Sequence, residues 1–200
     1  MSRAIVRPDR SRASFPLKGQ TVEQKRLLYS KEIIDRRVKA LAGEISSDLE
    51  GREVVLIGVL KGAFIFLADL ARYLKIPHTV DFVRLASYGA GTTSSGNIIV
   101  TKDIETDIEG KDVVIVEDII DTGASILFLQ ERLKEQHPSS IKVCALIDKK
   151  QRRERAVNAD YVGFALDEGF IVGYGLDFDE KFRCLPAIYV IKEGNCDYSV

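Results

Sequence analysis

The sequence predicts an α/β fold: a mainly parallel, twisted sheet flanked by helices, with a small hood built from the carboxyl-terminal third. Two observations predict it. Short runs of apolar, often β-branched residues alternate with segments of helical periodicity, as in repeated strand–helix–strand units. Polar and glycine-rich residues follow these apolar runs, at the strand ends where open α/β sheets bind ligands.

The elements follow one another at regular intervals. Apolar residues spaced by four, three, four and four predict a helix over residues 30–49, which Gly51 ends. Further helices are expected from residue 63 to 74 and from residue 125 towards Pro138. Strands of the main sheet are expected at residues 54–60, 78–85, 98–101, 113–116 and 141–147. The short runs at 161–166, 170–174 and 187–191 lack intervening helices and suit the hood.

Length and composition indicate one catalytic domain. The chain has 200 residues, of which 46% are hydrophobic, enough for a single core. Its 29 basic residues nearly balance 30 acidic ones, so nucleic acid is not an expected partner. No apolar run approaches the roughly 18 residues of a membrane span, and the amino terminus has no signal-peptide core. Three cysteines without metal-ligand spacing favour a reducing, cytoplasmic setting.

Residues 1–20 differ from the rest of the chain. They hold five basic residues against one acid, Asp9, and show no periodicity. We expect a flexible basic arm, disordered or in contact with another subunit, rather than an organelle-targeting leader. Residues 21–200 then form the domain.

The most informative stretch is residues 112–129, an apolar strand, a short loop and a helix. The loop is expected to carry Glu117, Asp118 and Asp121, followed by the small residues Thr122, Gly123, Ala124 and Ser125. Main-chain N–H groups and a helix amino terminus suit a phosphate, whereas carboxylates suit sugar hydroxyls or a divalent cation. A ligand with both a phosphate and a polyhydroxylated ring satisfies the whole loop. A solvated surface turn is the alternative, but it leaves three acids at the end of an apolar strand unexplained.

Residues 113–123, Val-Val-Ile-Val-Glu-Asp-Ile-Ile-Asp-Thr-Gly, resemble the phosphoribosyl diphosphate signature of the type I phosphoribosyltransferases. The Glu-Asp-Ile-Ile-Asp-Thr-Gly form is most similar to the hypoxanthine/guanine branch. The similarity extends from about Tyr29 to about Lys192. It implies the type I phosphoribosyltransferase fold, a homo-oligomer (dimer or tetramer), and small-molecule substrates, namely phosphoribosyl diphosphate and a 6-oxopurine.

The resemblance divides the central loop by role. It implies that Asp121 is the catalytic residue beside N7 of the purine, and that Glu117 and Asp118 hold the ribose hydroxyls. Residues Thr122, Gly123, Ala124 and Ser125 correspond to the phosphate cradle.

A second loop follows the strand at residues 54–60. Leu60, Lys61 and Gly62 match the family's pyrophosphate loop, which contains a non-proline cis peptide, and Ala63 stands where a second glycine is common. Lys61 alone is weak grounds, because a lysine before a helix is usually solvated. The resemblance also implies that Arg183 lies near the pyrophosphate, and arginine suits bidentate phosphate contacts.

Residues 87–97 are rich in glycine, serine and threonine and cannot pack a core. An ordinary long hairpin is one interpretation, and a dinucleotide fingerprint is excluded because no third glycine and no helix follow. The resemblance favours a lid that closes over the reaction centre, with Ser87 and Tyr88 at its base.

The resemblance also implies a base site and a metal. Lys149 matches the family's lysine that contacts the 6-oxygen, with Lys150 as its nearest rival. Phe170 would stack on the purine while the backbone of Ile171 reads the ring edge, although Phe170 could equally be a core residue. The resemblance implies that Mg²⁺ is bound by the carboxylates of Glu117, Asp118 and Asp177.

The function implied is transfer of a 5-phosphoribosyl group to N9 of hypoxanthine, and of guanine, with release of pyrophosphate. Two alternatives stay open: a phosphoribosyl diphosphate-binding regulator of the same fold, and a transferase for another base such as xanthine or a pyrimidine. Asp121, Lys61, Tyr88 and Arg183 argue against the regulator, and Lys149 with the Phe170 segment argues against another base.

Overall fold

A computed structural model describes residues 25–87, 98–150, 153, 155, 157–167 and 169–191. The helices are Lys31–Asp48 (α1), Phe64–Tyr73 (α2) and Ala124–Lys134 (α3). The strands are Lys25–Tyr29 (β1), Val54–Leu60 (β2), His78–Ser87 (β3), Ile98–Lys102 (β4), Asp112–Ile120 (β5), Ser140–Lys149 (β6), Tyr161–Leu166 (β7), Phe170–Val172 (β8) and Ile188–Ile191 (β9).

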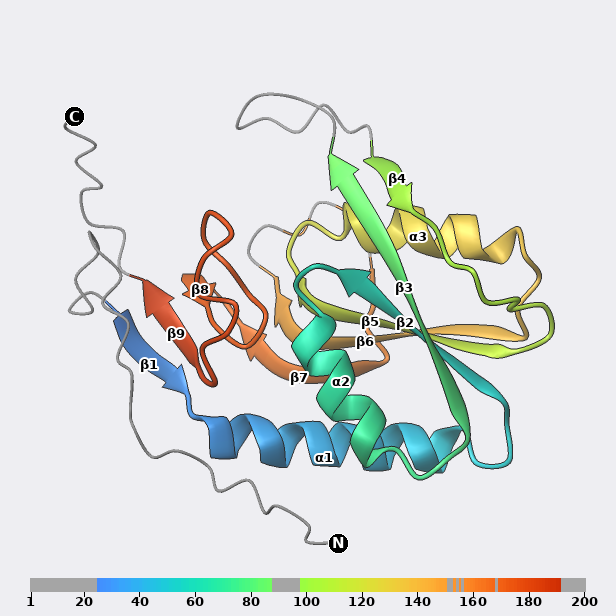
Figure 1. The fold of residues 1–200 in the computed structure, drawn as a ribbon, viewed down its shortest axis with the longest axis horizontal. Helices are drawn as coiled ribbons and strands as arrows, with labels where there is room; N and C mark the ends of the chain where they lie inside the picture. The colour runs from blue at the N-terminus through green and yellow to red at the C-terminus, as the bar shows by residue number, and fades with distance from the viewer. Residues whose placement is uncertain are drawn as a thin grey trace, which may run out of the picture.

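Six strands form the main sheet in the order β4-β3-β2-β5-β6-β7 (Figure 1). All neighbours pair in parallel except β3 and β4, which are antiparallel. This confirms the predicted mainly parallel α/β fold. Within the described chain no helix is long and apolar enough to cross a membrane.

The helices cover both faces of this sheet, and each face has its own core. Helices α1 and α2 pack with Val54, Leu56 and Val114 on one face. Helix α3 packs with Val55 and Ile57 on the other. Neighbouring residues of a strand point to opposite faces, so a strand covered on both sides must be apolar throughout. That requirement explains why β2 is apolar along its whole length and why residues 113–116 of β5 are all apolar.

The hood is a three-stranded antiparallel sheet in the order β1-β9-β8. Two corrections follow. Residues Tyr161–Leu166, expected in the hood, pair in parallel with β6 and extend the main sheet. The hood instead gains β1, which enters from near the amino terminus, about 160 residues away in sequence from β9. Such long-range pairing leaves no local sequence signal.

The central strand is longer than its apolar run suggested. Strand β5 continues to Ile120, so Glu117 and Asp118 lie within the strand and not in the loop after it. The loop proper begins at Asp121, and α3 starts at Ala124. The amino-terminal arm 1–20 and the lid residues 88–97 lie outside the described residues, so those two expectations stay predictions.

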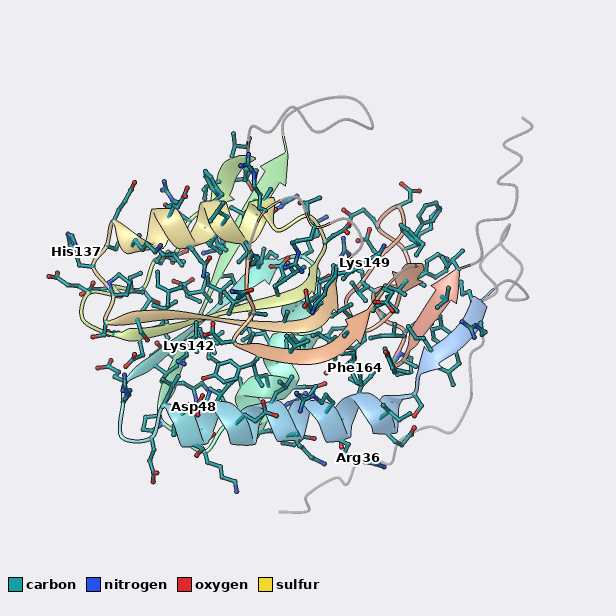
Figure 2. The ribbon with its side chains drawn as sticks, turned by 180° about the vertical axis from the view of Figure 1, so that it is seen from behind. Arg36, Asp48, His137, Lys142, Lys149 and Phe164 are labelled. Carbon is teal, nitrogen blue, oxygen red and sulfur yellow. The ribbon has the colours of Figure 1, made fainter. Side chains whose placement is uncertain are left out.

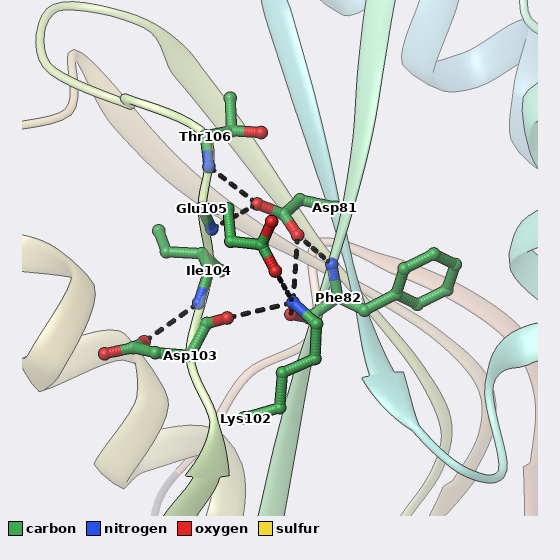
Figure 3. A network of polar contacts seen from close by, with 7 residues as sticks. All are labelled: Asp81, Phe82, Lys102, Asp103, Ile104, Glu105 and Thr106. Atoms are coloured by element: carbon green, nitrogen blue, oxygen red, sulfur yellow. Dashed lines mark hydrogen bonds and ion pairs between the residues drawn. The ribbon is translucent and has the colours of Figure 1, made fainter.

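A buried carboxylate secures the segment that follows β4 (Figure 3). Asp81 of β3 accepts hydrogen bonds from the main-chain N–H groups of Phe82, Glu105 and Thr106, at 2.6–2.8 Å. Lys102 lies 3.5 Å from the same carboxylate and donates to the Phe82 carbonyl. Burial by itself would raise the pKa of Asp81, but the three N–H donors outweigh it and lower the pKa to about 2.

Candidate active site

Three groups of residues singled out from the sequence lie at the carboxyl ends of β2, β5 and β6: Leu60 to Gly62, Glu117 to Ser125, and Lys149. These strand ends face the hood (Figure 1). From β2 the chain proceeds to β3 on one side, while β5 lies on the other, so the strand order reverses between β2 and β5. Ligands of open α/β sheets bind at such a switch point. The fold therefore places the candidate site where two loops and the hood meet.

The closest approach in this site joins three segments. A Cβ atom added to Gly62 would lie 1.8 Å from the Asp118 carboxylate, and one added to Gly175 would lie 2.1 Å from the Gly62 carbonyl oxygen. Gly175 also has a φ of 102°, which suits glycine. The loop after β2 thus touches the Asp118 side chain at the end of β5 and the main chain of the turn between β8 and β9. A side chain at Gly175 would collide with main chain, so glycine is required there, whereas one at Gly62 would displace the Asp118 carboxylate.

Both helices that begin at the site start without a capping side chain from the residue that precedes them. Ala63 precedes α2 and Gly123, with φ of 86°, precedes α3. The Thr122 hydroxyl accepts one hydrogen bond, from the Ala124 N–H at 3.3 Å. Helix amino termini attract anions through their free N–H groups and dipole. The peptide between Leu60 and Lys61 is cis, as the resemblance implied.

Two buried carboxylates at the end of β5 have perturbed acidities. Burial raises the pKa of Glu117 well above its ordinary value, and the neighbouring Asp118 charge raises it further. Burial also raises the pKa of Asp118, to about 6, against opposing contributions from main-chain N–H groups and Arg183. Oε2 of Glu117 has no hydrogen-bond partner among the described residues. Such groups are typical of a ligand-binding site.

Two cations from different segments converge on one oxygen atom. Lys61 Nζ lies 2.9 Å and Arg183 Nη2 3.2 Å from Oε2 of Glu180, which is exposed. Hydrogen bonds from these cations lower the pKa of Glu180. The site therefore already holds an anionic oxygen between the lysine of the pyrophosphate loop and the arginine of the hood.

Several contacts within residues 173–187, the hood turn between β8 and β9, hold Arg183 in place. Its Nη1 donates to the Gly175 carbonyl at 2.9 Å, and its Nη2 pairs with Asp177 at 2.9 Å. Asp177 also accepts from the Glu180 N–H at 2.8 Å. Nε of Arg183 is buried without a hydrogen-bond partner in the described chain.

The expected base site is formed by β6 and the hood. Lys149 ends β6 and donates from Nζ to the Gly169 carbonyl at 3.1 Å, so its head group faces the strand that carries Phe170. Figure 2 shows Lys149 near the hood, at the opposite end of the sheet from His137. Phe170 is 42% exposed and meets Phe178 edge to face, so it is not a core residue, whereas Ile171 is buried. Lys150 is exposed and lies beyond the strand.

Two carboxylates, those of Asp118 and Asp177, could bind one magnesium ion together with oxygens of the substrate. Among the residues described, no three His, Cys, Asp or Glu side chains form a metal cluster. Mg²⁺ needs only one or two carboxylates when phosphate oxygens complete its shell. Asp118 and Asp177 are close enough for the Asp177 charge to raise the pKa of Asp118, in addition to the larger effect of burial. A bound cation would relieve this repulsion.

Sequence reasoning missed two residues of the site. Arg153 stands in the charged run that follows β6, and such a run is usually solvated, yet its guanidinium is directed towards the end of β5 and the loop after it. Glu180 had no motif to mark it. Only the positive φ of several hood residues, 51° at Asp179 and 59° at Glu180, distinguishes this turn, and the sequence does not show it.

The fold and the site define a class of protein: an α/β protein whose cations, carboxylates and helix amino termini meet at a switch point beneath a hood. Comparison with known proteins makes the class specific. Residues 26–179 match the model of the phosphoribosyl transferase domain, and the chain belongs to this family.

Several relatives are similar over most of their length. The hypoxanthine-guanine phosphoribosyltransferase of Aquifex aeolicus is 47% identical over 169 residues, covering 84% of this chain and 95% of the relative. A crystal structure of a hypoxanthine-guanine phosphoribosyltransferase from Bacillus anthracis superposes with a TM-score of 0.81 at 45% identity, covering 84% of this chain and 99% of that one. A hypoxanthine phosphoribosyltransferase structure from Staphylococcus aureus gives a TM-score of 0.83 at 34% identity, covering 90% and 100%.

Proposed function

We propose that this chain transfers the 5-phosphoribosyl group of phosphoribosyl diphosphate to N9 of hypoxanthine, and of guanine, releasing pyrophosphate and serving purine salvage. The relatives carry this activity in their names and match the chain over 84% of its length. The transferase is the interpretation that uses every segment gathered at the switch point.

One observation carries the proposal: Lys61 and Arg183 converge on a single carboxylate oxygen. In a complex, a pyrophosphate oxygen would replace that of Glu180. Departure of pyrophosphate leaves an electron-poor ribose with oxocarbenium character, as in glycoside cleavage. Two cations placed at the leaving group stabilise the negative charge that develops there.

The end of β5 and the loop after it divide the remaining work. Glu117 and Asp118, buried at the strand end, would accept hydrogen bonds from the ribose hydroxyls. Thr122, Gly123, Ala124 and Ser125 would receive the 5-phosphate at the amino terminus of α3. Asp121 would face N7 of the purine, where a carboxylate accepts a proton or stabilises charge on the ring.

The base would lie between the hood and β6. Lys149 donates to the 6-oxygen of the purine, in exchange for its present contact with the Gly169 carbonyl. The exposed ring of Phe170 offers a stacking surface, and the main chain of Ile171 reads the ring edge. The family resemblance implies that Ser87 and Tyr88 would belong to a lid that keeps water away from the oxocarbenium-like ribose.

Magnesium belongs to the proposal because the substrate carries a diphosphate. Asp118 and Asp177 would hold the ion, with Glu117 beside them. Bound there, the ion would supply charge neutralisation for the pyrophosphate.

Setting and assembly complete the proposal. The described cysteines, Cys144 and Cys184, are free thiols, which suits a reducing cytoplasm. A homo-oligomer, dimer or tetramer, is proposed from the family resemblance.

The test is an assay with phosphoribosyl diphosphate, Mg²⁺ and each purine separately. Hypoxanthine and guanine should yield the nucleotide and pyrophosphate. Adenine should be a very poor substrate, because its 6-amino group cannot accept a hydrogen bond from Lys149. Turnover of adenine at the rate of hypoxanthine would refute the base assignment. Tight binding of phosphoribosyl diphosphate without turnover of any base would instead support a regulator.

A further inference from the structure

Arg153 follows β6 in a charged segment, but its side chain is only 17% exposed. Its guanidinium uses all three nitrogens. Nε donates to the Asp121 carbonyl at 3.2 Å, and Nη1 donates to the Val157 carbonyl at 2.6 Å. Nη2 donates to the Ile120 carbonyl at 3.4 Å and forms an ion pair with Asp148.

These acceptors lie where two neighbouring strands of the sheet end. Ile120 is the last residue of β5, and it stands opposite Asp148 of β6 in the parallel register. The next residues are Asp121, which begins the loop after β5, and Lys149, which is the last residue of β6. One guanidinium thus ties together the strand ends that carry the proposed catalytic carboxylate and the proposed base-binding lysine.

The segment around Arg153 encloses the loop as well. The Arg155 main-chain N–H donates to the Thr122 carbonyl at 3.1 Å. A Cβ atom on Gly123 would lie 3.1 Å from the Arg155 carbonyl oxygen and 3.2 Å from Cδ of Arg153. The loop therefore packs closely against residues 153 and 155. A shift of these residues would shift the main chain of the loop as well.

We propose that Arg153 is a positioning residue that fixes the main chain at Ile120 and Asp121 and thereby holds the Asp121 carboxylate in place for phosphoribosyl transfer. It acts through the main chain of Asp121. A planar guanidinium offers five donors in a fixed arrangement, whereas a lysine ammonium is a single point charge that cannot bind these separated carbonyls together. The kinetic consequence rests on the proposed function, but the contact with the loop does not.

The kinetic test compares Arg153→Lys in two backgrounds. In the otherwise unchanged enzyme, kcat should fall about 10- to 100-fold, because small errors in the placement of a reacting group are costly, while KM for phosphoribosyl diphosphate should change less than about threefold. In the Asp121→Asn background the same substitution should change kcat less than about twofold. A kcat equal to that of the unchanged enzyme, or an equal loss in both backgrounds, would overturn the proposal.

Arg155→Lys is the matched control. It makes the same substitution two residues further along, at an exposed side chain whose residue contacts the loop through its main chain. Its kcat should equal that of the unchanged enzyme. A loss comparable to that of Arg153→Lys would assign the effect to the segment and not to the Arg153 guanidinium.

Amide hydrogen exchange in the absence of substrates tests the contact itself. Arg153→Lys should accelerate exchange of residues 121–125 about tenfold or more, while Arg155→Lys should not. Val114 and Val116 in the core of β5 report global opening, so an equal acceleration there would overturn the proposal, as would unchanged exchange in the loop. If the unchanged protein turned over no purine, the proposed function would fail, yet this comparison would still decide the role of Arg153.

Discussion

At the scale of single residues, the proposed chemistry depends on which carboxylate meets which part of the substrate. Asp118 is buried at the end of β5, with a pKa raised by its burial to about 6, whereas Asp121 begins the loop beyond the strand. The first lies where a sugar would bind in the ground state, and the second would act on the base only as the bond forms. Their replacement should therefore affect different kinetic constants.

Asp121→Asn keeps the size of the side chain and removes its charge and basicity. We expect kcat to fall by about 10²–10⁴, the range of general acid–base catalysis, with little change in the affinity for phosphoribosyl diphosphate. Asp118→Asn should weaken that affinity as well, because its partner is present before the reaction. Titration with phosphoribosyl diphosphate alongside steady-state kinetics separates the two. Near-normal kcat in Asp121→Asn would remove its catalytic role and favour the regulator.

Glu180 competes for the cations that the pyrophosphate needs. Its carboxylate accepts from Lys61 and Arg183, so a diphosphate must displace it. Glu180→Gln weakens that competition, and we expect pyrophosphate to bind about threefold more tightly, a small effect because the pairs are exposed. Calorimetric titration measures it. Asp179→Asn, one residue away and exposed, is the control, and weaker binding in Glu180→Gln would show that Glu180 supports the site instead.

At the scale of elements, Asp81 connects β3 to the segment after β4, beside the strands that lead into the lid sequence. Its pKa of about 2 lies below the value of about 3.9 expected in an unfolded chain, so its carboxylate stabilises the fold above pH 4. That contribution, about 2 kcal/mol, is lost as the pH falls from about 4 to about 2.

Asp81→Asn should therefore lower the free energy of unfolding at pH 7 by about 2 kcal/mol, and the difference from the unchanged protein should shrink near pH 3. Urea unfolding at both pH values measures this. Asp107→Asn is the control, because its carboxylate is exposed and accepts a single local N–H. A constant difference between pH 7 and pH 3 would mean that Asp81 acts by packing and not by charge.

At the scale of the whole molecule, the site exists only because the hood lies against the carboxyl ends of the central strands β2 and β5. Gly175 lies against the Gly62 carbonyl, and Gly62 lies against the Asp118 carboxylate, so the hood, the loop after β2 and the end of β5 are in contact. Asp177 from the hood and Asp118 from the sheet are thereby brought close enough to repel. A divalent cation would join the two parts of the molecule at this point.

We expect turnover to require a divalent cation, because the diphosphate substrate and the acidic site otherwise repel each other. Excess chelator should abolish activity, and added Mg²⁺ should restore it. The melting temperature in the presence of phosphoribosyl diphosphate should rise further when Mg²⁺ is added, since a ligand that binds the folded state stabilises it. Full activity in excess chelator would contradict the role given to the carboxylates.

The sequence by itself determined the parallel sheet and the central loop. Strand β2 was predicted at its observed bounds, because a strand covered on both faces must be apolar along its whole length. The acids Glu117, Asp118 and Asp121 were found because they interrupt such a run at its carboxyl end. The family resemblance added Lys61, Lys149 and Arg183, whose local sequence is that of ordinary surface cations.

Only the tertiary structure decided how these segments meet. The placement of β7 in the main sheet and of β1 in the hood depends on pairing between residues far apart in the chain. In the sequence, Arg153 is one of several neighbouring charged residues and has no distinguishing signal. In the structure, its guanidinium donates to the carbonyls of Ile120 and Asp121. Glu180 likewise matters only because Lys61, from a loop more than a hundred residues earlier, reaches it. Local sequence records propensity and burial, whereas these contacts arise from the path of the whole chain.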